Sequence, residues 1–468
     1  MFFFFHTLID KMTKHFDRLT YDNKLILAPM VRVGTLPMRL LALRYGADIV
    51  YTEELIDWKF LKSVRIVNEA LGTIDYIDKS DGTVVFRTCN EEKDRVVVQM
   101  GTCDPQRALK VAKMIENDIA GIDINMGCPK EFSLKGGMGA ALLTQPEKAK
   151  AILTTLVQNV NIPITCKIRV FENAERTISL VKELASTGIS AIAVHGRTKQ
   201  ERPQHLNRNS TIKAVAQEVD IPVIANGGSR EIDRYNDILA FKKSCGASSV
   251  MVARAAESNC SIFCKSGVKD LEVVIKDYLK LAIEYDNSPS NTKYCVQNML
   301  KELQETPRGK KFLECQTLEQ ICSIWGLGEF CRKKQLEFQS KGMLGRREVT
   351  PDMFTDRPNK KIKMQDDDHD VFQLKCAFIR VNFAKDIDLP KSKLITYCGR
   401  NKIKVPTYQI IHENKLFRAV ATLEGRKYSS TYWEKNKRFA EQGAALACCV
   451  GLGLIDKQSL IDDGSILE

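Results

Sequence analysis

The stretch with the most specific chemistry is residues 123–143, which read DINMGCPKEFSLKGGMGAALL. An apolar run ends in Cys128, and a proline and a glycine-rich loop follow it. A thiol with a pKa near ~8.5 is mostly protonated at neutral pH and can therefore donate a proton. Gly127 frees the backbone to turn, and Pro129 fixes φ and removes a donor. The pattern predicts Cys128 as an acid catalyst; the alternative is one more small buried residue among fifteen cysteines.

Polar residues also end or interrupt other apolar runs. Lys167 lies inside ITCKIRV, where a lysine that points inward must meet an anion, such as a reduced flavin, or a hydrogen-bonding partner. His195 ends AIAVH, and Arg169 and Arg197 could pair with phosphate or with carbonyls of a planar base. Asn125 offers such a base both a donor and an acceptor. The alternatives are a snorkelling lysine and a core histidine.

A candidate phosphate site follows the last two apolar runs. Gly227 and Gly228 come after IPVIAN, and Ala253 and Arg254 come at the end of SSVMVA. Glycine allows close backbone approach, and N–H groups at a helix start bind anions. Plain turn glycines are the other interpretation.

Eight short apolar runs must position these residues. Most are continuous, as in parallel strands buried on both faces, and amphipathic patterns such as 105–117 and 174–187 separate them. This alternation predicts a (β/α)8 barrel, whose strand ends meet at one mouth, with a doubly wound open sheet as the competing topology. The expected strands are residues 24–30, 48–54, 95–100, 121–126, 164–170, 190–195, 221–226 and 248–253.

The rest of the chain changes character twice. Helical periodicity covers 271–286, 292–305, 316–326 and 328–342, and the last 85 or so residues follow an α–β–β–β–α pattern with an extra strand-like stretch at 369–390. The expected domains are a tail 1–19, a barrel 20–265, a helical domain 266–340, a linker 341–370, an α+β domain 371–456 and a tail 457–468.

Composition narrows the possible partners. Residues 371–455 carry fifteen Lys+Arg against six Asp+Glu, so +9 of the net charge of +12 lies there, which favours a polyanion as partner. No apolar run reaches the ~18 residues of a membrane span. The many cysteines show no metal-binding spacing, so we expect neither metal nor membrane, and a cytoplasmic protein, with the mitochondrion as the alternative. We expect a monomer, although the sequence leaves the dimer open.

Several motifs in order resemble the tRNA-dihydrouridine synthases over about residues 20–455. They are LAPM, NMGCPK with KGGMGAALL, CKIRV, AVHGRT, IANGG and VMVARAA. The order resembles the eukaryotic type that carries a double-stranded-RNA-binding domain. The resemblance implies FMN at the barrel mouth, NADPH as reductant, tRNA as partner and a D-loop uridine, position 20, as substrate. The flavin-binding positions that it implies are Pro29, Met30, Val31, Gln99, Lys167, His195, Asn226, Gly227, Gly228, Ala253 and Arg254.

The resemblance also implies the source of each hydrogen: reduced FMN gives a hydride to C6 of a uracil, and Cys128 protonates C5. The target base must leave its stack to be reached, and the loop with Gly136, Gly137 and Gly139 can fold over it. Lys135 in this loop could meet a neighbouring phosphate.

The C-terminal pattern resembles a double-stranded-RNA-binding domain, which reads shape and charge. The residues expected at the RNA are Lys435, Lys437 and Arg438 at the last helix, Lys402 and Lys404 in the preceding loop, and Lys375 and Arg380 in the extra stretch. A solvated basic face is the alternative. For the whole chain, two alternatives stay open: an FMN-dependent oxidoreductase of small pyrimidines, and a non-catalytic RNA-binding scaffold.

Overall fold

The computed structural model describes residues 19–343, 371–413 and 416–466. The chain divides into two compact units, residues 1–295 and 296–468. The expected tail 1–19 and linker 341–370 lie almost wholly outside the described residues. The described part of the chain contains no helix long and apolar enough to cross a membrane.

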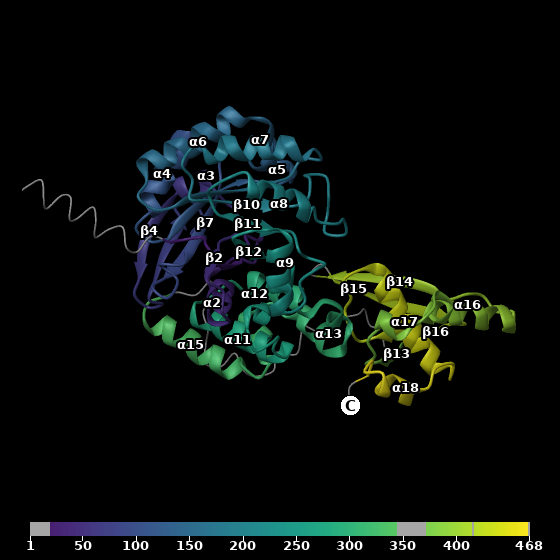
Figure 1. Cartoon of the computed structure of the whole chain (residues 1–468). Coiled ribbons are helices and arrows are strands. Elements are labelled where there is room, and N and C mark those ends of the chain that lie inside the picture. The colour runs from purple at the N-terminus through teal and green to yellow at the C-terminus, as the bar shows by residue number, and fades with distance from the viewer. Residues whose placement is uncertain (1–18, 344–370, 414–415, 467–468) are drawn as a thin grey trace, which may run out of the picture. The chain divides into compact units, whose positions relative to one another are not determined.

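The first unit is built on a closed sheet of eight parallel strands (Figure 1). Hydrogen bonds join neighbours in the order β2-β1-β12-β11-β10-β9-β8-β7, and β2 pairs with β7 to close the ring. The barrel prediction is therefore confirmed, and an open doubly wound sheet is excluded. The strands are β1 Leu25–Leu27, β2 Ile49–Tyr51, β7 Val96–Gly101, β8 Gly121–Met126, β9 Ile164–Arg169, β10 Ala191–His195, β11 Val223–Asn226 and β12 Ser249–Val252.

Helices cover the outside of the barrel, and two of them begin at a side-chain cap. Asp104 accepts a hydrogen bond from the Arg107 N–H at 2.8 Å, and Asn173 does the same for Arg176 at 2.8 Å. The helices of this unit are α2 Leu36–Arg44, α3 Asp57–Leu61, α4 Pro105–Ile115, α5 Glu131–Lys135, η1 Gly139–Thr144, α6 Pro146–Asn159, α7 Ala174–Ala185, α8 Asn209–Gln217, α9 Tyr235–Ser244, α10 Arg254–Ser258, η2 Cys260–Phe263 and α11 Leu271–Glu284.

One part of the first unit was not predicted. Between the second and third barrel strands lie β3 (Leu55–Ile56), which pairs with β7, and an antiparallel sheet of β4 (Ser63–Asn68), β5 (Thr73–Asp78) and β6 (Val84–Cys89). The alternation in TIDYID and the turn at Gly82 (φ +69°) were the available signals.

The second unit begins inside α12 (Pro289–Leu300) and has a helical part. Its other helices there are η3 Lys301–Glu305, α13 Pro307–Glu314, α14 Leu318–Ser323 and α15 Gly328–Ser340.

The C-terminal part of this unit confirms the α+β prediction. The sheet order is β13-β16-β15-β14, with β13 parallel to β16 and the other pairs antiparallel. The elements are β13 Val371–Leu374, η5 Arg380–Asn382, η6 Asp386–Asp388, α16 Pro390–Asn401, β14 Thr407–Glu413, β15 Leu416–Leu423, β16 Arg426–Ser430, α17 Lys437–Gly451 and α18 Lys457–Asp462.

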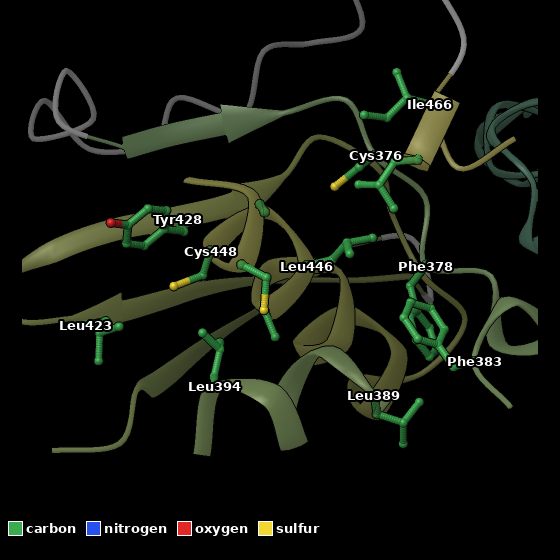
Figure 2. Close-up of a cluster of buried hydrophobic side chains, with 14 of the residues drawn as sticks. Cys376, Phe378, Phe383, Leu389, Leu394, Leu423, Tyr428, Leu446, Cys448 and Ile466 are labelled. Carbon is green, nitrogen blue, oxygen red and sulfur yellow. The ribbon is translucent and has the colours of Figure 1, made fainter. Parts of the chain in front are cut away.

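The core of this α+β part gathers side chains from several elements (Figure 2). Leu394 of α16 and Leu446 of α17 pack with Tyr428 of β16 and with Phe378, which follows β13. Ile466 joins the same cluster, so residues 457–466 of the expected tail 457–468 contribute both α18 and core contacts.

A buried ion pair ties the helical layer of the first unit to its extra sheet. Arg39 of α2 donates to both carboxylate oxygens of Glu92 at 2.8 and 2.6 Å, and these side chains are 2% and 0% exposed. Arg39 also donates to the carbonyl oxygens of Gly34 and Arg87. Because Arg39 and Glu92 are both buried and bonded within the protein, water cannot replace either partner. Removal of one charge therefore leaves the other buried and uncompensated.

We predict that Glu92→Gln lowers the free energy of unfolding by about 3 kcal/mol, because it strands the Arg39 charge. The neighbouring pair Arg44–Glu91 supplies a matched control, since its side chains are 47% and 36% exposed. Glu91→Gln should cost under ~1 kcal/mol. Urea unfolding followed by circular dichroism measures both; equal effects would contradict the prediction.

Candidate active site at the barrel mouth

A cavity of about 750 Å³ opens among the carboxyl ends of the barrel strands. All the residues that the sequence assigned to a flavin line this cavity, together with Asn125, Cys128, Arg169 and Arg197. Closure of the barrel brings them together from strands far apart in sequence, at the face where active sites of this fold lie.

The backbone around Cys128 is held by a side chain one turn back. The Asn125 Oδ1 accepts hydrogen bonds from the N–H groups of Gly127 at 2.9 Å and Cys128 at 3.0 Å. The Cys128 carbonyl accepts from the Ala140 N–H at 3.0 Å. Gly139 has φ +57°, and a Cβ there would lie 2.7 Å from the Cys128 oxygen. Only glycine fits this contact, so the glycine-rich loop closes directly on the cysteine.

The surroundings of the Cys128 thiol favour its protonated form. Burial raises the pKa of the thiol, and the nearby Glu54 carboxylate raises it further, while the Ser133 hydroxyl opposes the rise. The side chain is only partly buried and lines the cavity. A neutral thiol in contact with a cavity can donate a proton to a bound molecule.

Asn125 belongs to a buried chain of hydrogen bonds. Its Nδ2 donates to Gln99 Oε1 at 3.2 Å, and Gln99 Nε2 donates to Asp123 Oδ2 at 2.8 Å. Thr165 donates to the other Asp123 oxygen at 2.7 Å, and burial raises the pKa of Asp123 to about 6. Because both ends of the Asn125 amide are engaged, the geometry favours a positioning role, and its predicted contact with substrate stays a prediction.

Lys167 enters the cavity from β9 without a partner. Burial, and secondly the Arg169 charge, lower the pKa of its ammonium to about 8. Among the described residues none forms a hydrogen bond or ion pair with this ammonium, although the Asp123 charge acts on it from a distance. A desolvated cation that no carboxylate contacts directly suits an anionic or carbonyl-rich planar group, as the reduced isoalloxazine of FMN is.

His195 is neutral in this site. Burial lowers the pKa of its ring well below the usual value, and the Lys167 charge adds to this. Arg197 Nη1 lies 3.2 Å from His195 Nε2, which makes Nε2 the acceptor and leaves the ring proton on Nδ1.

The two arginines assigned to substrate hydrogen bond to loop carbonyl groups. Arg197 is 2% exposed, and it donates to the carbonyl oxygens of His205 at 2.8 Å and Gly227 at 2.7 Å. Arg169 donates to the carbonyl oxygens of Gly127 and Thr198, each at 2.9 Å. Both guanidinium groups therefore brace loops of the mouth; their contact with substrate stays a prediction.

The phosphate-site residues form a tight cradle. Gly227 has φ +113°, and a Cβ on it would lie 2.0 Å from Asn207 Oδ1. A Cβ on Gly228 would lie 2.8 Å from Ile232 Cδ1. Arg254 begins α10, is separated from the end of β12 by one residue, is 62% exposed, and its Nη1 lies 3.6 Å from Glu257. The close backbone and the exposed guanidinium suit a phosphate, so the residues present fit FMN.

The remaining predicted residues lie elsewhere. Lys135 of α5 does not line the cavity; it is 77% exposed and pairs with Glu131 at 2.7 Å. In the second unit, Lys437 and Arg438 are exposed at the start of α17, where the Asn436 side chain caps the Phe439 N–H at 2.9 Å.

The other RNA candidates are also in the second unit. Lys435 is exposed at the start of α17, although partial burial lowers its pKa, and Lys402, at the end of α16, has φ +55°. Lys404 and Lys375 are exposed, whereas Arg380 pairs with Asp386 at 2.8 Å.

Sequence reasoning missed several residues of the site. Among them, Glu54 and Ser133 act on the Cys128 thiol, and Glu201 and Arg202 line the cavity. Glu54 ends the expected strand 48–54, so the polar ends of strands could have pointed to it; nothing local marks Ser133.

Comparisons with known proteins agree with this architecture. Residues 26–324 match the family model described as dihydrouridine synthase (Dus), and residues 390–452 match the double-stranded RNA binding motif. A relative from Schizosaccharomyces pombe, tRNA-dihydrouridine(20) synthase [NAD(P)+], is 41% identical over 293 residues, 60% of this chain and 60% of that protein. The protein of the same name from Saccharomyces cerevisiae is 36% identical over 300 residues, 60% of this chain and 78% of that protein.

A solved structure, the crystal structure of a tRNA-dihydrouridine(20) synthase dsRBD domain, is 34% identical, covers 18% of this chain and 93% of that chain, and has a TM-score of 0.18. The fold and the cavity define a barrel protein with its site at the carboxyl ends of the strands. Because the Dus model matches well over half of it, the chain belongs to the dihydrouridine synthase family. It spans about three fifths of the length of the fission yeast relative.

We predict that Asn125→Ala loosens the turn at Cys128, because two N–H groups lose their acceptor. Amide exchange at Gly127 and Cys128, measured by hydrogen–deuterium exchange, should accelerate about tenfold or more. Asn173→Ala removes a comparable acceptor at the start of α7 and should leave this segment unchanged. Unaltered exchange in Asn125→Ala would show that other contacts hold the turn.

Proposed function

We propose that this protein is an FMN-dependent tRNA-dihydrouridine synthase that reduces the C5=C6 bond of a D-loop uridine, position 20, with NADPH as electron donor. The observation that carries the proposal is that Cys128 opens on the same cavity as Lys167, His195 and the glycine cradle. Family membership and the names of the yeast relatives, which specify position 20 and NAD(P)+, support it.

FMN, when bound and reduced, supplies a hydride to C6 of the uracil. The residues of this chain do the rest. Lys167 provides positive charge for the reduced ring, and neutral His195 offers a hydrogen bond without adding charge. Gly227, Gly228 and Arg254 hold the phosphate.

Cys128 completes the reduction. Hydride addition at C6 places charge on C5 and the C4 oxygen, and the neutral thiol donates its proton to C5. The turn held by Asn125 and Gly139 fixes the direction of this donor. A base inside an RNA stack cannot reach the cavity, so the uridine must flip outward.

The basic α+β part supplies affinity for tRNA. Exposed Lys435, Lys437 and Arg438 precede or begin α17, whose N-terminus adds favourable partial charge toward phosphates. Lys402, Lys404, Lys375 and Arg380 extend this surface in the proposal, and Lys135 meets a phosphate near the target base. The protein then works as a cytoplasmic monomer.

The first test is spectroscopic. The purified protein should bind FMN and lose its visible flavin absorbance with NADPH; unmodified tRNA should restore it anaerobically, and free uracil should not. Restoration by a free pyrimidine would favour a small-molecule oxidoreductase. A protein that takes up no FMN would be an RNA-binding scaffold, and the proposal would fail.

We predict that Cys128→Ala slows reoxidation of the reduced protein by tRNA about 10²-fold or more, because C5 loses its proton donor. FMN content and reduction by NADPH should stay close to wild type. Cys264→Ala is the matched control, since Cys264 is also partly exposed but does not line the cavity. Stopped-flow absorbance measures both variants; a Cys128→Ala rate equal to wild type would remove the thiol from the mechanism.

We predict that the double variant Lys437→Ala/Arg438→Ala weakens tRNA binding at least about tenfold and makes it less sensitive to salt. Each phosphate contact contributes roughly 0.7 to 0.9 to the slope of log K against log salt, so the slope should fall by about 1 to 2. Lys457→Ala, an exposed lysine of α18, is the control. Fluorescence anisotropy in a salt series measures this; an unchanged slope would contradict the assignment.

A further inference from the structure

A carboxyl group that the proposed reaction does not use lies beside the Cys128 thiol. Glu54 follows β2, lines the cavity and extends over the end of β7. A Cβ on Gly101 would lie 2.8 Å from Glu54 Oε1 and 3.3 Å from its Cγ, so the absence of a side chain at Gly101 makes room for the carboxyl. Glu54 and Cys128 thus come from separate barrel strands and meet at the mouth.

The contacts of Glu54 differ from those of its neighbour. Glu53 Oε2 accepts a hydrogen bond from the Arg32 N–H at 2.5 Å. Glu54 Oε1 is buried, and no described residue provides it with a hydrogen bond. The Glu54 carboxyl and the Cys128 thiol line the same cavity, and each acts on the pKa of the other. A buried carboxyl that is left with so few protein partners is an unusual cost in a folded site and suggests a function.

Other groups that act on this pair are identifiable. Lys130, two residues past Cys128, places a positive charge near Glu54, and the Lys167 and Arg169 charges act on Cys128. Ser133 of α5 is fully buried, and its hydroxyl lies with Cys128 against Gly139 and lowers the pKa of the thiol. The thiol therefore has one anionic neighbour, Glu54, and one neutral hydroxyl neighbour, Ser133.

We propose that Glu54 is a positioning residue for Cys128: it holds the thiol proton in place before transfer and relays a proton back to the sulfur afterwards. The first half of this role concerns the protein alone. The second half rests on the proposed function, because it requires that Cys128 has given its proton away.

The relay balances without any further reactant except water. When the S–H bond breaks and the C5–H bond forms, a thiolate remains beside the Glu54 carboxylate. Two adjacent negative charges favour uptake of one proton from solvent. The proton joins a Glu54 oxygen, then the O–H bond breaks as the S–H bond re-forms, and both groups return to their starting state. Burial raises the pKa of Glu54, which favours its transient protonation.

The test of the first half is alkylation of Cys128 by iodoacetamide across pH 6 to 10, read by mass spectrometry on the peptide that contains it. The thiolate is the reactive form. Glu54→Gln removes the anionic neighbour, so its alkylation profile should move to lower pH, with a rate roughly three- to tenfold above wild type below the thiol pKa. Ser133→Ala should move the profile the opposite way, because it removes a group that favours the thiolate.

Glu53→Gln is the matched control: it neutralises the adjacent carboxyl, which is bound to Arg32, and should leave the profile of Cys128 in place. A purely structural role of Glu54 would not produce shifts of opposite sign in Glu54→Gln and Ser133→Ala. Should Glu54→Gln not fold, Glu54→Asp, which keeps the charge but withdraws it, should give a smaller shift in the same direction.

The second half is tested on the full-length protein loaded with FMN. In Glu54→Gln, the first turnover with tRNA should stay within about threefold of wild type, whereas steady-state turnover should fall about tenfold or more and recover with small diffusible acids such as imidazole. An alkylation profile of Glu54→Gln identical to wild type would overturn the proposal. If tRNA did not reoxidise even the wild-type protein, the proposed function would fail, and the alkylation shift would still decide whether Glu54 holds the thiol proton.

Discussion

Closure of the barrel by the β2–β7 pairing is the constraint on which the site depends. Eight strand ends separated by more than two hundred residues of sequence meet only because the first and last members of the hydrogen-bonded ring are joined. Glu54 after β2, Cys128 after β8 and Lys167 on β9 could not share one cavity in an open sheet. The strands carry the apolar residues that bury the ring, so the polar groups collect at its rim.

At the barrel mouth, two kinds of polar side chain can be distinguished by their hydrogen bonds. Those whose polar atoms are bonded within the protein support the site, and those whose polar atoms lack such partners are available to a ligand. Arg197 and Asn125 are buried, and their polar atoms find partners inside the protein, which makes them rigid supports. Lys167 and Glu54 are desolvated, yet neither is saturated by described residues. Burial of such groups costs free energy, and binding of a ligand or a proton offsets this cost. Buried ionisable groups of this kind have shifted pKa values, which are common at functional sites.

The sequence predicted the parts of the fold whose signal is local. Continuous apolar runs gave all eight barrel strands, and the motif residues were found at one cavity. The sheet of β4, β5 and β6 was missed because its half-exposed strands carry only a weak alternation. Glu54 and Ser133 were missed for a different reason: their importance lies in a contact with Cys128 from distant or unmarked positions. The contact of Arg197 with a phosphate or a base was expected from its residue type and its place after a strand, and only the surrounding carbonyl groups reveal how it is held.

The environment of Cys128 decides whether its sulfur acts as an acid or as a nucleophile. A helix start and positive charges usually lower a cysteine pKa and produce a reactive thiolate. Cys128 has both nearby, since α5 begins at Glu131 and the Lys167 and Arg169 charges reach it. Burial and the Glu54 carboxylate nevertheless prevail and raise the pKa of the thiol. Burial and one carboxyl together therefore turn a position suited to nucleophilic attack into one suited to proton donation, and we propose that the same carboxyl restores the proton.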